Sequence, residues 1–335
     1  MIRALITGIA GQDGWYLGSL LRSKGYNVVG MVRERGVALA SKRPDFPEQP
    51  HFDRLCYGEL ADAGSVRNAI GKVRPDEIYH LGAQSSVVAS FSAPEETADI
   101  NAMGTLRLLE AIRHHRLDCK FFNASSSEIF GKVQEVPQTE TTPFCPRSPY
   151  GVSKTFALQM TRMYREIHGL FACNGILFNH ESPLRPDSFV TKKITNAAVA
   201  IAEGTQQTVY LGNLNAVRDW GYAGDYVQVM WRMMQHDRGD DYVIATGRMT
   251  TVREFAAAAF NAVGISLDWS GQGVEEQGID ANGIVRVAVS PEFFRPAEVD
   301  ATVGDASKAH TVLGWQPTVD LDQLVQMMVA EALRA

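Results

Sequence analysis

A glycine-rich turn near the start of the chain most constrains what this sequence can fold into. The apolar run 4–7 is followed by Gly8, Gly11 and Gly14, and a helical pattern begins at Trp15. Strand, glycine turn and helix in this order are typical of a parallel sheet that binds a dinucleotide, because glycines let the backbone approach a pyrophosphate at a helix amino terminus. The sequence therefore predicts a dinucleotide site. Its candidate residues are Gly8, Gly11, Gln12, Asp13 and Gly14.

The rest of the first half supports the same fold class. Apolar, strand-like runs alternate with helical patterns, as expected for a parallel sheet covered by helices on both faces. We therefore predict an α/β protein with a Rossmann-type doubly wound parallel sheet and a smaller, mixed C-terminal lobe. The expected strands are 4–7, 27–32, 55–57, 77–81 and 120–124, and the expected helices are 15–23, 103–114, 149–168 and 255–263.

The second half divides less clearly. We predict a nucleotide-binding domain at 1–175 with a returning segment at about 215–246, and a smaller nucleotide-sugar-binding lobe at 176–214 and 247–335. That lobe would close over the carboxyl ends of the strands, where open α/β sheets bind ligands. Long loops rich in proline, glycine or charge are expected at 33–49, 179–188, 270–282 and 291–299.

Composition excludes several classes of function. The net charge of −6 gives no general attraction for nucleic acid or an anionic membrane. No apolar run reaches the roughly 18 residues of a membrane span. The four cysteines form no C-x-x-C pair, so they are expected to be reduced thiols in a cytoplasmic protein. The histidines lack metal-binding spacing, and we predict no metal site.

The residues after the second expected strand bear on the choice of cofactor. An acid there binds the ribose 2′-hydroxyl of NAD, whereas an arginine accommodates the 2′-phosphate of NADP. Two arginines flank one acid, Glu34, and we therefore predict NADP, with Arg33 and Arg35 as contacts. In the alternative interpretation Glu34 is simply paired with a neighbouring cation. Candidates near adenine and ribose, in segments that taken alone could be ordinary loops, are Glu59, Leu60, Leu81, Gly82, Ala83, Gln84 and Ser85.

Four further residues predict redox chemistry on an alcohol. Tyr150 and Lys154 are four residues apart, so they share one face of a helix, which the Ser148-Pro149 start signal places here. A lysine ammonium held beside the phenol is expected to lower the tyrosine pKa and make it a base for a sugar hydroxyl. Ser126 can hydrogen-bond the same hydroxyl.

Glu128 suggests a second step. It lies two residues beyond Ser126 at a strand end, so both side chains can face one pocket. Oxidation of an alcohol to a ketone acidifies the adjacent C–H, and a carboxylate is a suitable base for removing that proton. In the alternative interpretation Glu128 only caps the segment that begins at Ile129. A simple alcohol dehydrogenase would not need this acid.

Several longer segments resemble a known family. Residues 124–131 and 146–154 are similar to the active-site segments of the extended short-chain dehydrogenases/reductases. The run Asn179-His180-Glu181-Ser182-Pro183, with segments 218–221, 223–227 and 293–300, closely resembles the GDP-mannose 4,6-dehydratase family within that group. The likeness covers nearly the whole chain. In this family threonine is usual where this chain has Ser126, and serine keeps the hydroxyl.

The resemblance implies roles for individual residues. The matching positions make Ser126, Glu128 and Tyr150 catalytic, assisted by Lys154. Contacts to the cofactor are implied for Tyr150, Lys154, His180 and Arg185. The residues implied to hold a GDP-sugar are Asn179, Lys193, Arg218, Arg295 and Glu298. Taken alone, each charged residue could instead belong to a surface ion pair, as for Arg218 beside Asp219.

The resemblance also implies assembly and activity. The family has adjacent arginines after the second strand, in a loop that reaches a neighbouring subunit's cofactor, whereas this chain has Arg33-Glu34-Arg35. We expect a homodimer or a homotetramer. The predicted reaction is internal NADP-mediated oxidation of GDP-mannose at C4, elimination of water and re-reduction at C6. The alternatives are a dehydratase of another nucleotide sugar such as a GDP-heptose, a reductase of the 4-keto product, and a non-catalytic NADP-sensing protein.

Overall fold

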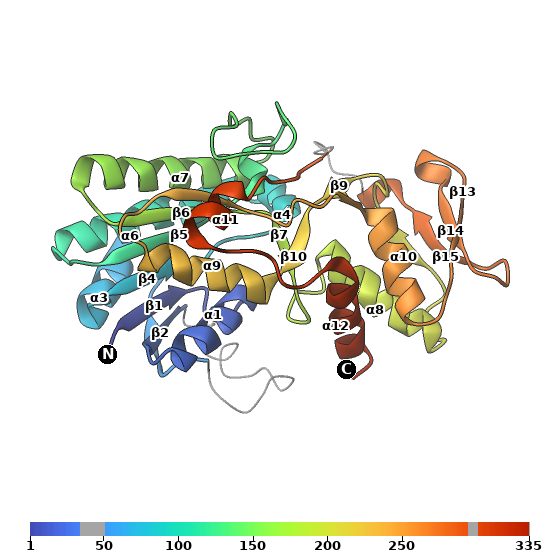
Figure 1. Cartoon of the computed structure of the whole chain (residues 1–335), viewed down its shortest axis with the longest axis horizontal. Coiled ribbons are helices and arrows are strands. Elements are labelled where there is room, and N and C mark those ends of the chain that lie inside the picture. The colour runs from blue at the N-terminus through green and yellow to red at the C-terminus, as the bar shows by residue number, and fades with distance from the viewer. Residues whose placement is uncertain (34–50, 294–300, 335) are drawn as a thin grey trace.

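The computed structural model describes residues 1–33, 51–293 and 301–334. Figure 1 shows a large sheet covered by helices at one side of the molecule and a smaller group of helices and strands at the other. Short strands join the two. The predicted α/β class with a Rossmann-type parallel sheet is confirmed.

The large sheet has seven strands in the order β11-β6-β5-β4-β1-β2-β3, and all its pairs are parallel. The chain builds outward from β1 in one direction and from β4 in the other. The strand order therefore reverses between β1 and β4, which is where such sheets bind ligands. The strands are β1 (Arg3–Thr7), β2 (Asn27–Val32), β3 (Arg54–Tyr57), β4 (Glu77–His80), β5 (Lys120–Ser126), β6 (Ala172–Leu177) and β11 (Asp241–Ile244).

Helices cover both faces of this sheet and bury a separate apolar cluster on each. One face carries α1 (Gln12–Ser23), α9 (Ala223–Gln235) and α11 (Ser307–Leu313). The other carries α3 (Ala63–Val73), α6 (Gly104–His114) and α7 (Pro149–His168). Two short helices, α4 (Val87–Ser92) and α5 (Pro94–Ala98), and a π-helix (Asp99–Met103) precede α6.

A second apolar core lies in the smaller unit. It is enclosed by α8 (Val190–Ala202), α10 (Val252–Ala262), α12 (Leu321–Ala332) and a four-stranded sheet. That sheet contains β8 (Val209–Leu211), β13 (Asp268–Ser270), β14 (Gln277–Ile279) and β15 (Val285–Val289). Two strand pairs stand between the units, β7 (Asn179–Glu181) with β10 (Trp220–Tyr222), and β9 (Val217–Arg218) with β12 (Thr250–Thr251). Short 3-10 helices are Ser127–Ile129, Gly273–Glu275 and Pro291–Phe293.

The structure corrects several expected boundaries. Helix α1 begins at Gln12 rather than Trp15, because Gly11 serves as its N-cap. The expected loops 179–188 and 270–282 contain β7 and β14, which form because distant strands pair with them. Helix α11 lies within 247–335, the range that the sequence assigns to the smaller lobe. It nevertheless packs on β11 of the large sheet. The expected loops 33–49 and 291–299 lie largely outside the described residues.

Two further observations concern the described residues alone. No helix within them combines the length and apolar character required to cross a membrane. All four cysteines have free thiols.

Candidate active site

A cavity of about 390 Å³ opens at the carboxyl ends of the central strands. Ser126, Glu128, Tyr150 and Lys154 all line it, although they come from β5, a 3-10 helix and α7. Tyr150 and Lys154 are buried. The structure therefore brings the four predicted catalytic residues together at one site.

Local sequence explains how these side chains are placed. Ser126 ends β5, and its Oγ accepts a hydrogen bond from the Glu128 backbone N–H at 3.3 Å. The cap of this short helix is therefore Ser126, not Glu128, and the glutamate lines the cavity. Ser148 caps α7 by accepting from the Gly151 N–H at 3.0 Å, with Pro149 at the first helical position.

The lysine does not act on the tyrosine as the sequence suggested. Lys154 Nζ donates to the Ala124 carbonyl at 2.8 Å and lies 5.8 Å from the Tyr150 ring centroid. The pKa of Tyr150 is raised to about 12, and burial is the main cause. The negative charge of Glu128 also raises this pKa, whereas the hydrogen bond with Ser126 partly offsets the increase. Burial also lowers the pKa of Lys154 to about 8. The expectation of a tyrosine pKa near neutrality is wrong for the surroundings that the protein itself provides, because burial penalises the phenolate.

The glycine turn is closely packed at two of its three glycines. Gly8 has φ of +75°, and a Cβ on it would lie 2.8 Å from Gly82 N. A Cβ on Gly14 would lie 2.4 Å from Gly8 O, so both positions exclude larger residues. Gly11 caps α1 without any side-chain hydrogen bond, and its Cβ position meets only Gly8 O within 4 Å. Gly11 is exposed, and the first turn of α1 that follows it has backbone N–H groups without intrahelical partners.

Two residues of that first turn contact β7. Asp13 Oδ2 lies 2.7 Å from His180 Nε2, and Gln12 Nε2 donates to the His180 carbonyl at 3.1 Å. Ser182 Oγ donates to Gln12 Oε1 at 2.8 Å. These contacts join residues that are 167 to 170 positions apart in the chain. They fix the dinucleotide turn against the strand that leads to the smaller unit.

The hydrogen bonds of His180 indicate that it is an imidazolium. Its Nδ1 lies 2.8 Å from the Phe178 carbonyl, which only accepts, so Nδ1 carries a proton. Its Nε2 faces the Asp13 carboxylate and therefore carries a proton too. Burial opposes both charges, but their attraction and hydrogen bond outweigh it, so the pKa of Asp13 is lowered and that of His180 is raised. The ring also stacks on Tyr226, with centroids 4.5 Å apart.

Asp13→Asn is expected to lower the free energy of unfolding by roughly 1–3 kcal/mol near pH 6, because a hydrogen bond between two charges is lost. The carboxylate with a lowered pKa stabilises the fold above its ordinary value of 3.8, and the imidazole with a raised pKa does so below its ordinary value of 6.5. The difference from the parent should therefore be full between these values and shrink as pH rises through the folded-state pKa of His180. Urea unfolding from pH 5 to 9 measures it, with the exposed Asp118→Asn as control. A difference that does not change with pH would contradict the charged pair.

The residues implied to hold a GDP-sugar cluster where they are described. Asn179, Lys193 and Arg218 all line the cavity, and the Lys193 ammonium lies 3.6 Å from the Phe293 ring centroid. The alternative of an Arg218–Asp219 surface ion pair is wrong, because both side chains are buried. Asp219 instead accepts hydrogen bonds from Thr246 N and Oγ1 and from the backbone N–H groups of Gly247 and Gly304.

The remaining predicted residues fall into three groups. Those that also line the cavity are Asp13, Leu81, Ala83, Ser85, His180 and Arg185. Those that lie at strand ends or in the glycine turn without lining it are Gly8, Gly11, Gln12, Gly14, Arg33, Glu59, Leu60, Gly82 and Gln84. Those outside the described residues are Arg35, Arg295 and Glu298.

The sequence did not predict the buried carboxylate that pairs with Arg185. Glu181 is buried and pairs with Arg185 Nε at 3.0 Å, while Thr191 Oγ1 donates to its carboxylate at 2.6 Å. The i,i+4 spacing of Glu181 and Arg185 was an available signal. No local pattern links Asp13 with His180. Within the described ranges no group of three or more histidine, cysteine or acidic side chains is arranged to hold a metal ion.

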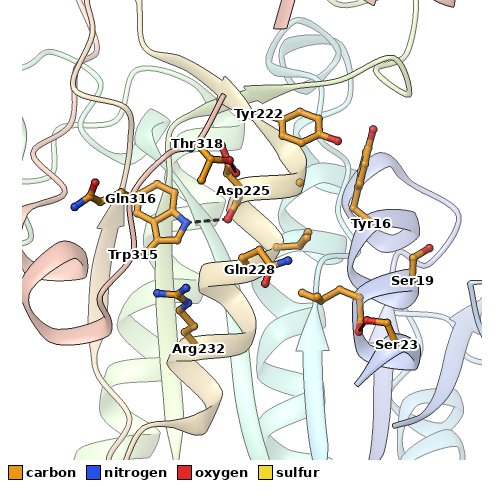
Figure 2. Close-up of a pocket in the computed structure, with 13 residues that line it drawn as sticks. Tyr16, Ser19, Ser23, Tyr222, Asp225, Gln228, Arg232, Trp315, Gln316 and Thr318 are labelled. Carbon is orange, nitrogen blue, oxygen red and sulfur yellow. Dashed lines mark hydrogen bonds between the residues drawn. The ribbon is translucent and has the colours of Figure 1, made fainter. Parts of the chain in front are cut away.

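A second cavity, of about 570 Å³, lies between α1 and α9 away from the strand ends (Figure 2). Its polar groups already serve the fold. Asp225 accepts from Thr318 N and Oγ1, the Trp315 indole N–H donates to the Asp225 carbonyl, and Arg232 donates to the carbonyls of residues 313 and 314. These bonds anchor the segment after α11, and the four predicted catalytic residues line the other cavity.

The chain is similar to known proteins in both sequence and fold. The chain is 48% identical to a GDP-mannose 4,6-dehydratase from Vibrio cholerae, over 99% of this chain and 94% of that protein. It is 49% identical to GDP-mannose 4,6 dehydratase 2 from Caenorhabditis elegans, over 98% and 88% of the two chains. The solved structure of a Thermus thermophilus UDP-glucose 4-epimerase in complex with NAD superposes with a TM-score of 0.81 at 26% identity, covering 99% of each chain. The family model described as GDP-mannose 4,6 dehydratase matches residues 5–328, and this chain belongs to that family.

Proposed function

We propose that this protein is an NADP-dependent GDP-mannose 4,6-dehydratase, which converts GDP-D-mannose to GDP-4-keto-6-deoxy-D-mannose. The observation that carries the proposal is Glu128, a carboxylate in the same cavity as Ser126, Tyr150 and Lys154. Oxidation of the sugar needs only the last three residues. Elimination of water also needs a base for the C5 proton, and Glu128 is placed to supply it.

The residues present fit a nicotinamide dinucleotide. The exposed Gly11 and the first turn of α1 would hold the pyrophosphate, and exposed Arg33 follows β2 where a 2′-phosphate would lie. We propose NADP, with Arg35, which lies outside the described residues, as a further contact. When bound, the cofactor supplies the hydride acceptor for C4, the hydride donor for C6, and a positive ring that favours the Tyr150 phenolate.

The protein's own groups would act in sequence. Ser126 holds the C4 hydroxyl by a hydrogen bond, and Tyr150 takes its proton. Lys154, fixed on the Ala124 carbonyl, supplies a positive charge 5.8 Å from the centre of the tyrosine ring. Glu128 then removes the C5 proton of the 4-keto sugar and returns a proton to the C6 hydroxyl as it leaves as water. The C5 proton leaves with the C6 hydroxyl as water, and the proton that Tyr150 holds would balance the one added back at C5. The hydride removed from C4 would be the one delivered to C6, so no external reductant is consumed.

The cations around the cavity suit a nucleoside diphosphate. Lys193 and Arg218 line the same cavity as Asn179, and the protein's net negative charge makes such local cations necessary for an anionic substrate. We assign these three residues to the GDP-sugar, together with Arg295 and Glu298. We further assign the large sheet to the cofactor and the second core to the sugar nucleotide, in the cytoplasm, where free thiols persist.

One incubation tests the function. The purified protein, saturated with NADP+, is mixed with GDP-mannose without added reductant, and products are identified by mass spectrometry. A keto sugar lighter than the substrate by one water, formed over many turnovers per cofactor, is expected. No product from GDP-mannose, but turnover of a GDP-heptose under the same conditions, would overturn the substrate assignment. A requirement for stoichiometric NADPH would instead indicate a reductase.

An apolar stripe on α7 supports the proposal of a homodimer or homotetramer. Val152, Phe156 and Ile167 are 38% to 71% exposed and share one face of this helix. Exposed Val88 and Phe91 lie on α4, which packs beside α7. Another apolar surface is needed to cover this stripe. A second copy of the chain would present its own α7 stripe for this contact.

Phe156→Glu is therefore expected to shift the protein toward the 36.8 kDa monomer, because it places a charge in the middle of the stripe. Light scattering after size exclusion measures the mass. Val274→Glu, at an exposed apolar residue of the smaller unit, is the control and should keep the parental mass. A parent that is itself monomeric, or a Phe156→Glu variant with unchanged mass, would rule out this surface.

A further inference from the structure

His80 is a buried histidine that the proposed reaction does not use. It is the last residue of β4, 3% exposed, and it lies directly before the 81–85 segment expected to contact the cofactor. Its Nδ1 lies 2.8 Å from Thr7 Oγ1, and its Nε2 lies 3.1 Å from Thr105 Oγ1. Both threonines are 1% exposed. A polar ring is therefore held between two hydroxyls in the interior of the sheet.

The neighbouring bonds determine which ring nitrogen carries the proton. Thr105 Oγ1 donates to the Asn101 carbonyl at 2.8 Å, so it must accept from His80 Nε2–H. The hydrogen of Thr7 Oγ1 then points at the unprotonated Nδ1, and Thr7 Oγ1 accepts from Gly82 N–H at 2.9 Å. A second ring proton would leave the Thr7 hydroxyl hydrogen without this acceptor. Burial, with the nearby Lys154 charge, lowers the pKa of His80 to about 3 and so favours the same neutral form.

The chain of hydrogen bonds continues to the catalytic helix. Asn101, in the π-helix before α6, accepts from Gln84 N at 2.9 Å and donates to Gln84 O at 3.0 Å, as a neighbouring strand would. The same amide donates to Ser153 Oγ at 3.2 Å, and Ser153 donates to the Tyr150 carbonyl at 2.7 Å. One path therefore runs from the Gly82 amide through His80 to the first turn of α7.

We propose that His80, as the neutral Nε2–H tautomer, is a positioning residue that fixes the 81–85 segment relative to Tyr150. The path fixes Gly82 and Gln84, on the cofactor side, through Thr7 and Asn101. On the catalytic side it reaches Tyr150 through Ser153. Hydride transfer needs both partners in one geometry, and a rigid buried support provides it. This inference rests on the proposed use of a nicotinamide cofactor.

The chain offers a closely matched pair of threonines for a test. Thr105 and Thr161 are both buried in helices, and each donates to the carbonyl four residues earlier. Of the two, Thr105 alone has a histidine as a second partner among the described residues. Thr105→Val is expected to weaken NADP+ binding roughly tenfold, about 1.4 kcal/mol, measured by calorimetry without any sugar. Thr105→Ser should restore the parental dissociation constant, and Thr161→Val should leave it within about twofold.

Spectroscopy tests the tautomer in the unaltered protein. With 15N-labelled histidine, the His80 ring should give one protonated and one unprotonated nitrogen, identified by the signal lost in His80→Gln, and should not titrate between pH 5.5 and 8.5. This measurement stands even if Thr105→Val fails to fold. Parental NADP+ affinity in Thr105→Val, or a His80 ring that titrates in this range, would overturn the proposal. A parent that binds neither NADP+ nor NAD+ would instead overturn the proposed function.

Discussion

Glu128→Gln is expected to lower the rate of keto-sugar formation by roughly a thousandfold, within the range of 10²–10⁴ that a positioned general base contributes. Glutamine keeps the size of the side chain and its place in the cavity, but it cannot take the C5 proton. The oxidation at C4 does not depend on this carboxylate. Reduced cofactor should therefore appear on mixing the variant with GDP-mannose and then persist, because the reaction stops at the ketone.

Two measurements separate these steps. Absorbance of the reduced nicotinamide follows oxidation, and mass spectrometry in deuterated water follows exchange of the C5 proton and formation of product. Glu166→Gln, an exposed glutamate on α7, is the matched control and should behave as the parent. Parental product formation by Glu128→Gln would show that another group removes the C5 proton. The role assigned to Glu128 would then be wrong.

The elements that sequence predicted best are those whose signals are local. The helix 149–168 was predicted with both its ends, because Ser148 and Pro149 start it and Gly169, with φ of +66°, ends it. In contrast, β7 was expected to be loop. Its three residues carry no strand pattern of their own, and it forms by pairing with β10 some forty positions away. The capping box of Thr251 and Glu254 was an available signal that places the start of α10 before the expected residue 255.

The same contrast between local signals and long-range contacts holds for the candidate site. The glycine turn and the Tyr150–Lys154 spacing were visible because each is a short motif. The Asp13–His180 pair was not, because only the folded chain brings residues 167 positions apart into contact. The tyrosine pKa was expected to fall and instead rises, because its burial depends on packing that the spacing does not encode. Sequence therefore indicated which groups meet, while their charge states depend on the surrounding protein.

Tyr150→Phe is expected to lower the rate of keto-sugar formation by about 10³–10⁴, because it removes the only group that we assign to take the C4 hydroxyl proton. The ring that fills the cavity wall is kept, so NADP+ should bind within a few-fold of the parent. This variant stops the reaction one step earlier than Glu128→Gln does. It should therefore show neither reduced cofactor nor C5 exchange on mixing with GDP-mannose.

The raised pKa that the protein's own surroundings give Tyr150 makes this expectation more specific. At about 12 the phenol is almost wholly protonated at neutral pH, so the phenolate must form in the complex, where the positive nicotinamide ring and Lys154 act on it together. A tyrosine absorbance change on NADP+ binding should therefore titrate well below 12 in the parent and be absent in Tyr150→Phe. Tyr164→Phe, at a second buried tyrosine on α7, is the control and should keep both the signal and the rate. Reduced cofactor formed by Tyr150→Phe at the parental rate would assign the proton to another base, with Ser126 and Lys154 as the nearest groups to examine.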